Sequence, residues 1–291
     1  MSRFLAGHQK HKGNKEMKTL VKTLLVVLIL ILPATLIAGP VAMVMDLQGK
    51  ATANNKPLQL LAELDASTTI NIESGSVLTL VYLNTGEEYV IKGPKKAVLK
   101  ESALEVEGKA VAGSTLLASA ESLASGNYSQ AAIVMRSGKP KPKKLTIYSP
   151  VSTGILESNP TLHWQNMGKG FSYHVEVLSE NGDSLFVIET EKTSVDIPSS
   201  VTLPRKELLN WEVEANRGSI TYYNMADFFI ASKEDSKQIA AAKPKGSDKF
   251  SRKLLYAWLL ENKGITDEAQ KYWKILAKER PNDKVILSKL R

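Results

Sequence analysis

The chain has 291 residues, with 38 Lys and Arg side chains against 30 Asp and Glu, and it contains no cysteine. Such a length suits two or three small domains, because single domains usually contain about 100 to 150 residues. The hydrophobic content of 43% excludes an intrinsically disordered protein. The lack of cysteine excludes disulfides, thiolate metal sites and attachment of a lipid to a cysteine.

The net charge of +8 is unevenly distributed along the chain. Residues 1–38 carry a net charge of +5, residues 39–232 carry −4 and residues 233–291 carry +7. We expect no nucleic-acid partner, because such a partner requires a basic face with aromatic residues on a folded domain.

A basic and then apolar stretch opens the chain. Two lysines precede an apolar run from Leu24 to Ile37 that is interrupted by a proline. This run is shorter than the about 20 residues of a spanning helix and has the length of a signal-peptide core. We expect residues 1–38 to be a signal peptide, with Met17 as an alternative start, cleaved near Ala38 to release the protein into the periplasm. Membrane contact is then transient. The alternative is an uncleaved anchor in the inner membrane, with the protein facing the periplasm.

Strand-like runs separated by turns occupy residues 41–99. Apolar residues alternate with polar ones from Ile70 to Leu83, and the pattern resumes from Glu88 to Ile91. The intervening Thr85-Gly86 accepts positive φ and predicts a hairpin, and Gly93-Pro94 ends its second strand. We expect a small antiparallel sheet that closes or folds onto itself.

Four motifs follow one another here: L-Q-G-K-A from Leu47, L-x-L-L-x-x-L from Leu58, I-N-I-E-S-G-S-V-L-T-L from Ile70 and T-G-E-E-Y-V-I-K-G-P from Thr85. Their order resembles the FecR-like domain, a β module of bacterial envelope proteins. The resemblance covers about residues 41 to 100 and implies a compact all-β domain, which we expect to occupy residues 39–135. Signalling regulators with this domain also have a cytoplasmic segment that contacts a sigma factor, and the stretch before Leu24 is too short for one. A transmembrane signalling role is therefore a minor alternative.

The next stretch mixes several patterns. Residues from Ala103 to Val111 are expected to add one or two strands, whereas the alanine-rich segments 116–124 and 128–135 are compatible with helices. Residues 136–144, R-S-G-K-P-K-P-K-K, combine two prolines with five basic side chains and predict a solvated linker. A polyanion-binding patch is the alternative interpretation.

Residues 145–232 predict a second β domain, with short strand candidates about eight to twelve residues apart and a hairpin turn at Glu180 to Asp183. The motifs P-T-L-H-W from Pro160, Y-H-V-E-V from Tyr173 and L-N-W-E-V-E-A from Leu209 resemble a fibronectin type III or immunoglobulin-like sandwich. The resemblance implies that the tryptophans of the first and last motifs, Trp164 and Trp211, are core residues. The lack of cysteine fits the fibronectin type.

The C-terminal part is expected to be helical. Residues 233–249 are rich in Lys and Ala and predict a second linker, and residues 250–291 predict a helical hairpin. Ser247-Asp248 is the candidate cap of the first helix, which ends at Gly264, and the second helix starts at Thr266 or Asp267.

Four residues of this hairpin, Ala257, Ala269, Trp273 and Pro281, resemble one tetratricopeptide unit. A single helical pair is too short to be stable alone and needs a docking face. That face is expected on the chain's own sandwich or on a partner.

Catalytic and metal-binding motifs are not evident. The sequence has no G-x-S-x-G elbow and no glycine-rich phosphate loop. His163 and His174 are expected to meet across a sheet without a third ligand, which favours surface histidines. We expect no catalytic residue, no metal and no cofactor.

Aromatic residues are the candidates for a partner or glycan surface. Adjacent aromatic residues of a strand point to opposite faces, so one of each pair is expected to be exposed. The candidate residues are Tyr222, Tyr223, Phe228, Phe229, Tyr256, Trp258, Tyr272 and Trp273.

Three small domains on linkers favour a mainly β, non-enzymatic, exported protein that acts as an interaction or scaffold module for envelope proteins. Binding of peptidoglycan or another cell-wall polysaccharide is the alternative. A cell-wall hydrolase is a minor alternative.

Overall fold

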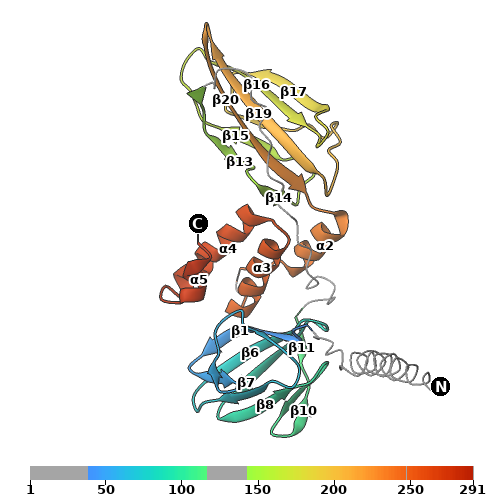
Figure 1. Ribbon diagram of the computed structural model, residues 1–291, viewed down its shortest axis with the longest axis vertical. Coiled ribbons are helices and arrows are strands. Elements are labelled where there is room, and N and C mark those ends of the chain that lie inside the picture. The colour runs from blue at the N-terminus through green and yellow to red at the C-terminus, as the bar shows by residue number, and fades with distance from the viewer. Residues whose placement is uncertain (1–38, 117–142, 247, 291) are drawn as a thin grey trace, which may run out of the picture. The chain divides into compact units, whose positions relative to one another are not determined.

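The computed structural model describes residues 39–116, 143–246 and 248–290 (Figure 1). Strands dominate this part of the chain, as predicted, and its helices lie within residues 233–288. None of these helices has the length and apolar character needed to cross a membrane. The expected signal peptide, the two alanine-rich segments from residue 117 onward and most of the linker at 136–144 lie outside the described residues.

The N-terminal module, residues 40–116, consists of short antiparallel strands. They are β1 (Ala42–Gln48), β2 (Ala51–Ala53), β3 (Lys56–Pro57), β4 (Glu63–Leu64), β5 (Thr69–Ile72), β6 (Val77–Tyr82), β7 (Glu87–Lys92), β8 (Lys95–Leu99), β9 (Leu104–Val106), β10 (Lys109–Val111) and β11 (Ser114–Thr115). Sheet A has the strand order β11-β7-β6-β1-β4, and sheet B has the order β10-β9-β8-β5-β2-β3. The expected small sheet is therefore a pair of sheets.

Turn residues set the pairing of these strands. The hairpin between β6 and β7 forms as predicted, and Gly86 in its turn has a φ of 69°. The β9–β10 hairpin turns at Glu107 and Gly108, both with positive φ, as a two-residue turn of the I′ type requires. The strands expected between Ala103 and Val111 are thus confirmed.

The second domain, residues 143–232, is a β-sandwich. Its strands are β12 (Lys143–Lys144), β13 (Ile147–Ser149), β14 (Thr153–Ile155), β15 (Thr161–Trp164), β16 (Ser172–Leu178), β17 (Ser184–Thr190), β18 (Ser194–Asp196), β19 (Leu208–Arg217) and β20 (Ile220–Ile230). Sheet C has the order β12-β20-β19-β16-β17, with β14 also pairing with β20, and sheet D has the order β13-β15-β18. The end of the predicted linker, Lys143 and Lys144, is therefore a short strand parallel to β20.

Two tryptophans occupy the core of the sandwich, as predicted. Trp164 and Trp211 are fully buried, with ring centroids 6.3 Å apart. The Trp211 indole N–H donates a hydrogen bond of 2.9 Å to the Pro150 carbonyl. The hairpin between β16 and β17 also forms at the predicted turn, where Gly182 has a φ of 88°.

Four helices follow the sandwich: α2 (Lys233–Ala242), α3 (Phe250–Asn262), α4 (Thr266–Glu279) and α5 (Lys284–Ser288). The prediction of a linker at 233–249 is wrong, because α2 occupies most of it. The Ser232 side chain caps α2 by accepting a hydrogen bond from the Asp235 N–H. Alanine and lysine are good helix formers, and the proline that suggested a linker lies just beyond the helix. An ion pair of 2.9 Å between Asp235 and Lys263 joins α2 to α3.

The boundaries of α3 and α4 agree in part with those predicted from the sequence. Lys249, rather than Ser247 or Asp248, is the N-cap of α3, and it makes no side-chain capping bond. The other end forms as predicted: the Gly264 N–H bonds the Glu261 carbonyl and the Ile265 N–H bonds the Leu260 carbonyl. This pair of bonds with a positive φ at glycine is a Schellman motif, which ends α3 and lets α4 begin at Thr266.

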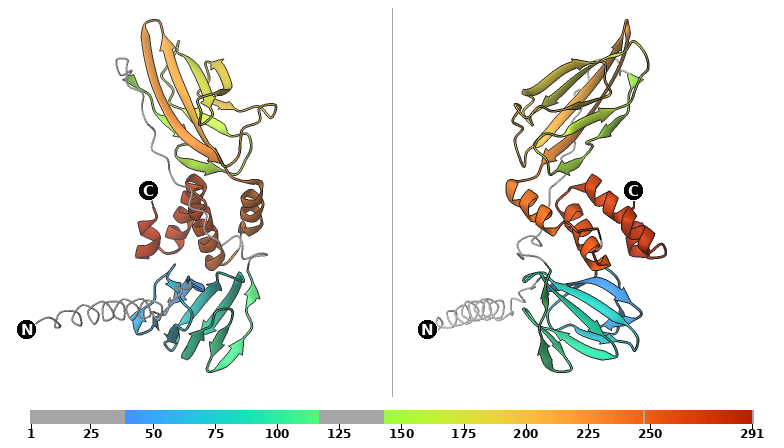
Figure 2. Two further views of the ribbon diagram at one scale, coloured as in Figure 1. Left: turned by 45° about the vertical axis from the view of Figure 1, so that its right-hand side comes forward. Right: turned by 180° about the vertical axis from the view of Figure 1, so that it is seen from behind.

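The helices share a hydrophobic core with the N-terminal module. Figure 2 shows the backbone of the helices next to the sheets of this module. Buried leucines of α3, among them Leu254 and Leu259, belong to the same cluster as Met43 of β1 and Leu80 of β6. The sandwich has a separate cluster around its tryptophans. The helical pair therefore packs on the first β module, and it also contacts the sandwich, where the Asp267 N–H donates a hydrogen bond of 3.2 Å to the Thr153 hydroxyl.

Polar contacts accompany this packing. Glu88 of β7 is only 4% exposed, and the Ser251 hydroxyl of α3 donates a hydrogen bond of 2.8 Å to its carboxylate. Arg280, at the end of α4, pairs with Asp46 of β1. A buried carboxylate is tolerated when it has such partners, so these contacts fix the helices on the module.

Candidate functional site

Three of the predicted surface aromatics are buried. Phe228 lies opposite Leu209 in the β19–β20 register, and this pair faces the core of the sandwich. Tyr256 packs edge-on against Tyr272, with ring centroids 4.6 Å apart, and Trp273 has no exposed surface. These residues cannot contact a partner, which corrects the prediction. The helical spacing of Tyr256 and Trp273 places both side chains in the core.

The remaining predicted aromatics are half-buried and lie on different elements. Tyr222 and Phe229 are on β20, where Tyr222 packs on the Phe171 ring at a centroid distance of 5.9 Å. Trp258 and Tyr272 pack against the core beneath the helices. The structure therefore does not assemble these side chains, or Tyr223, into one aromatic platform.

The two histidines also do not meet. His163 is on β15 of sheet D and packs at a tilt against Tyr148, with ring centroids 5.1 Å apart. His174 is on β16 of sheet C. Because the two strands belong to different sheets, the expected cross-strand pair is wrong.

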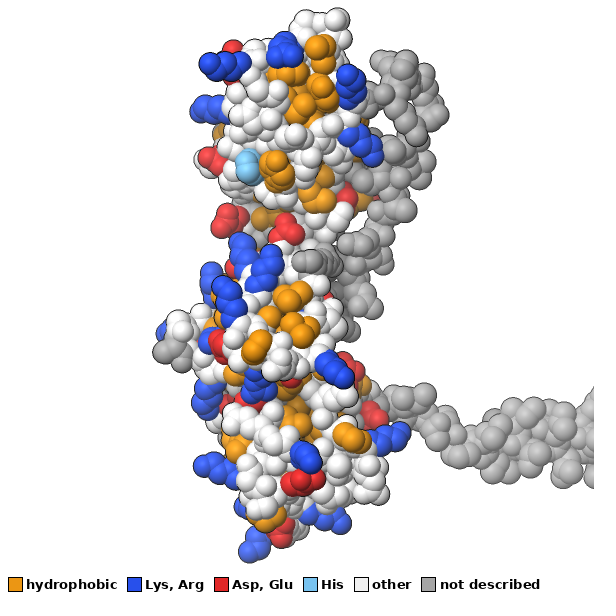
Figure 3. Space-filling model, turned by 90° about the vertical axis from the view of Figure 1, so that its left-hand side faces the viewer, with side chains coloured by type: hydrophobic (Ala, Val, Ile, Leu, Met, Phe, Trp, Pro, Cys, Tyr) orange, Lys and Arg blue, Asp and Glu red, His pale blue; other side chains and the backbone are white. Residues whose placement is uncertain are grey.

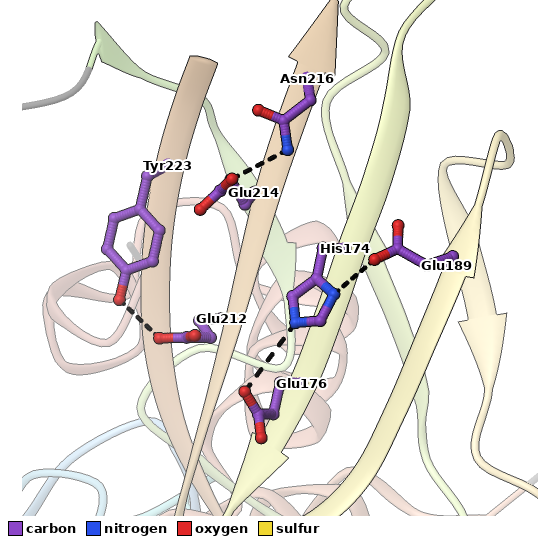
Figure 4. A network of polar contacts seen from close by, with 7 residues as sticks. All are labelled: His174, Glu176, Glu189, Glu212, Glu214, Asn216 and Tyr223. Carbon is purple, nitrogen blue, oxygen red and sulfur yellow. Dashed lines mark hydrogen bonds and ion pairs between the residues drawn. The ribbon is translucent and has the colours of Figure 1, made fainter.

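His174 instead lies among glutamates on the outer face of sheet C (Figure 4). Its Nδ1 is 2.7 Å from Glu189 Oε1 on β17, and its Nε2 is 3.9 Å from Glu176 Oε2 on β16. Two more glutamates, Glu212 and Glu214, come from β19 and face the same side. We call these five residues the acidic face.

Side chains of β19 and β20 continue this network. The Tyr223 hydroxyl of β20 donates a hydrogen bond of 2.7 Å to Glu212 Oε2. The Asn216 amide donates one of 2.8 Å to Glu214 Oε1. The network thus extends across β17, β16, β19 and β20 and holds several carboxylates in fixed positions.

Strict alternation in the sequence builds this face. In β16 and β19, tyrosine, valine and tryptophan point to the core, whereas the histidine and glutamates between them point outward. The sequence alone does not predict this face, because the strand register is a long-range property. Register places Glu176 opposite Glu212 and His174 opposite Glu214. The sequence does contain one indication of the face: polar residues, His174 and Glu176 in β16 and Glu212 and Glu214 in β19, recur at every second position.

The surrounding carboxylates change the acidity of His174 and Tyr223. The hydrogen bond to Glu189 raises the pKa of His174, with smaller contributions from Glu176 and Glu214 that burial partly opposes. Burial raises the pKa of Tyr223, and the hydrogen bond to Glu212 adds to this effect. A protonated His174 therefore compensates part of the negative charge on the acidic face.

We expect the stabilising contribution of the His174–Glu189 pair to depend on pH. Because the folded pKa of His174 is raised, this contribution is complete below the unfolded pKa of about 6.5 and disappears as pH rises through the folded value. Both side chains are more than a third exposed, so Glu189→Gln should lower the free energy of unfolding by only about 0.5 kcal/mol at pH 5.5. Denaturant unfolding of the two proteins at pH 5.5 and 8.5 measures the difference. This prediction is contradicted if the difference in the free energy of unfolding is equal at both pH values. It is also contradicted if Glu191→Gln gives the same difference.

Metal binding finds no support in the described residues, because no three His, Asp or Glu side chains there are arranged to hold an ion. A cleft of about 410 Å³ lies between β14 and helices α2 to α4. Its charged lining includes Glu268, which pairs with Lys271 at 2.7 Å. Glu268 and Lys271 thus neutralise each other's charge in the lining of the cleft.

Basic side chains of the helical segment are widely spread. Figure 3 shows Lys and Arg side chains with hydrophobic groups between them on one side of the molecule. Several lysines are held in ion pairs, such as Lys253 with Glu279 at 2.6 Å and Lys289 with Glu261 at 2.9 Å. The net positive charge of this segment is thus partly neutralised.

No family model matches the chain, and no curated protein matches it in sequence. Among solved structures, a two-domain fibronectin type III segment of chicken tenascin is 14% identical, covers 67% of this chain and 86% of that chain, and has a TM-score of 0.23. The FN1–FN3 domains of chicken CNTN1 are 10% identical to this chain. The match covers 66% of this chain and 57% of that chain, with a TM-score of 0.24. The spore cortex lytic enzyme SleM of Clostridium perfringens is 16% identical over 31% of this chain and 28% of that chain, with a TM-score of 0.22. At these TM-scores, neither the fold nor the function of those proteins is carried over.

Proposed function

We propose that the protein is an exported, non-enzymatic protein of the bacterial envelope that binds another protein through the acidic face of sheet C. The observation that carries this proposal is the alignment of four glutamates and a histidine across adjacent strands. A sheet face presents charges at fixed spacings without a cleft, which suits recognition of a protein surface better than conversion of a small substrate. The partner is an envelope protein with Lys and Arg side chains at the contact.

The helical segment has a different role in this proposal. Its apolar face lies in the core of the N-terminal module, so α3 and α4 stabilise that module within the chain. We assign the N-terminal module to the FecR-like class on its four sequence motifs, and the helical pair to a tetratricopeptide-like hairpin on Ala257, Ala269 and Trp273. We assign the sandwich to the fibronectin type, because the short strands β13, β15 and β18 form one sheet and the long strands β16, β17, β19 and β20 lie in the other.

The proposed location is the periplasm, reached by cleavage of residues 1–38 near Ala38. An uncleaved inner-membrane anchor is the alternative. The basis is the charge and length pattern of the leader sequence.

Crosslinking in intact cells followed by mass spectrometry tests the binding surface. We expect the Glu176→Gln/Glu214→Gln variant to lose at least about tenfold of the captured partner, because charges at such contacts are worth several kcal/mol together. The matched control is Glu63→Gln/Glu101→Gln, which removes two exposed charges from the N-terminal module. Equal capture by wild type and both variants would exclude the acidic face as the binding surface.

Two alternatives have distinct readouts. Retention of the protein on purified peptidoglycan, lost when Tyr222 or Tyr223 is replaced, would support glycan binding in place of protein binding. Lysis of peptidoglycan in a gel, lost on a single Glu or Asp substitution, would overturn the non-enzymatic assignment.

A further inference from the structure

The terminal strands of the four sheets differ greatly in length. In the part of the chain that the structure describes, the terminal strands β3, β4, β11 and β12 have two residues each, and β10, β13 and β18 have three. The terminal strand β17 of sheet C has seven residues. Short edges are a common protection against strand-to-strand association, so β17 departs from the pattern of the other edges.

The sequence of β17 has few of the usual protections: a bulge between Ser184 and Phe186 interrupts its pairing with β16 near the start of the strand, and the pairing is regular from Phe186 to Thr190. Its residues, S-L-F-V-I-E-T, include no proline and no lysine, the two residue types that commonly protect an edge strand. The aromatic and β-branched residues among them favour the strand conformation. The single charge, Glu189, is directed toward His174 of its own sheet. Val187 is 55% exposed at the middle of the strand. One side of β17 pairs with β16, and its other side has no backbone partner among the described residues.

We propose that β17 pairs antiparallel with β17 of a second copy of this chain, centred on Val187, so that two copies of sheet C form one continuous sheet. The inference goes beyond the proposed function, because pairing at the strand edge leaves the acidic face open.

The sequence of the strand is complementary to itself in this register. Val187 faces Val187 of the second copy, and Phe186 faces Ile188, which matches apolar side chains on both faces of the sheet. Glu189 is level with Leu185, whose side chain packs toward the core at the bulge. The two Glu189 side chains are then separated by four residues, about 14 Å along the strand. That distance exceeds the Debye length of about 8 Å at physiological ionic strength, so their repulsion is screened.

Other registers are less favourable. The pleat requires side chains of the same face to lie opposite each other in the two copies. When the two-fold centre moves by one residue, each residue is therefore paired with a residue two positions further along the second copy. Centring on Ile188 places Glu189 against Val187, and centring on Glu189 opposes two like charges, which destabilises a sheet. Centring on Val187 gives a two-fold pair that closes as a dimer and avoids both of these unfavourable contacts.

Sedimentation of the purified full-length chain over a concentration series tests the association. We expect a monomer–dimer equilibrium that Val187→Lys weakens by about tenfold or more, because two lysines would face each other at the centre. The control is Val90→Lys, since Val90 is 50% exposed on β7 of another sheet. A wild-type chain that stays monomeric, or a dimer that both substitutions weaken equally, would overturn the proposal.

Cysteine substitution tests the register without relying on a destabilising change. The chain has no cysteine of its own, so each variant has a single thiol. Residues directly opposite in an antiparallel pair have Cα atoms about 4.5 to 5.5 Å apart, which a disulfide spans. We expect V187C to form a disulfide-linked dimer on mild oxidation, and V90C and E189C to remain unlinked. Linkage through E189C, or none through V187C, would exclude the Val187-centred pairing.

Discussion

Replacing Trp273 by alanine is expected to lower the free energy of unfolding of the N-terminal module and its helices together by about 3 to 5 kcal/mol. Trp273 on α4 is fully buried in the cluster that contains residues of both β1 and α3. Removing the indole leaves a cavity that the surrounding sheet and helices cannot readily fill. The loss should therefore reach strands that are more than a hundred residues away in sequence.

Hydrogen exchange followed by mass spectrometry locates this effect. We expect peptides from β1 and β6 to lose protection along with peptides from α3 and α4, whereas peptides from β16 and β19 of the sandwich keep theirs. Loss of protection confined to the helices would mean that the module is stable without them. The shared core would then be much less important than its burial indicates.

The second large effect is expected for Trp211→Ala, which should destabilise the sandwich by about 3 to 5 kcal/mol. Trp211 is fully buried beside Trp164. Its indole N–H also donates to the Pro150 carbonyl, so the substitution leaves that buried acceptor without its partner. The combined loss should approach the total stability of a small domain.

The same exchange measurement should give the reverse pattern. In Trp211→Ala, peptides from β16 and β19 are expected to exchange faster, and those from β1 and α3 are expected to be unchanged. Each tryptophan variant is thus the control for the other. If either variant loosens the whole chain, the two hydrophobic clusters unfold as one unit.

Local features of the fold could be predicted from the sequence. The hairpins at Gly86 and Gly182 follow from turn residues that accept positive φ between alternating runs. The end of α3 at Gly264 follows from the same property of glycine. Trp164 and Trp211 as core residues follow from their apolar surroundings within strands. Each of these inferences depends on neighbours within a few residues.

Features that depend on distant contacts could not be predicted. The lysine-rich face of α2 suggested a linker, because its buried residues Ile239 and Ala242 gain their partners only in the folded chain. The acidic face needs the register between β16 and β19, which alternation alone does not specify. The aromatic residues of the helices looked available for a partner because the sequence does not show that β1 lies beneath them.

The shared core of the N-terminal module and the helices has a consequence for the order of folding. The sandwich lies between the two segments that form this core, so it is an insertion within a discontinuous unit. Contacts between β1 and α3 join residues about two hundred positions apart, and such closures are slow because of the entropy of the intervening chain. A chain emerging from the ribosome or a translocation pore completes the sandwich first. The N-terminal module then keeps an apolar surface uncovered until α3 and α4 arrive, and that interval is when the chain most needs a chaperone.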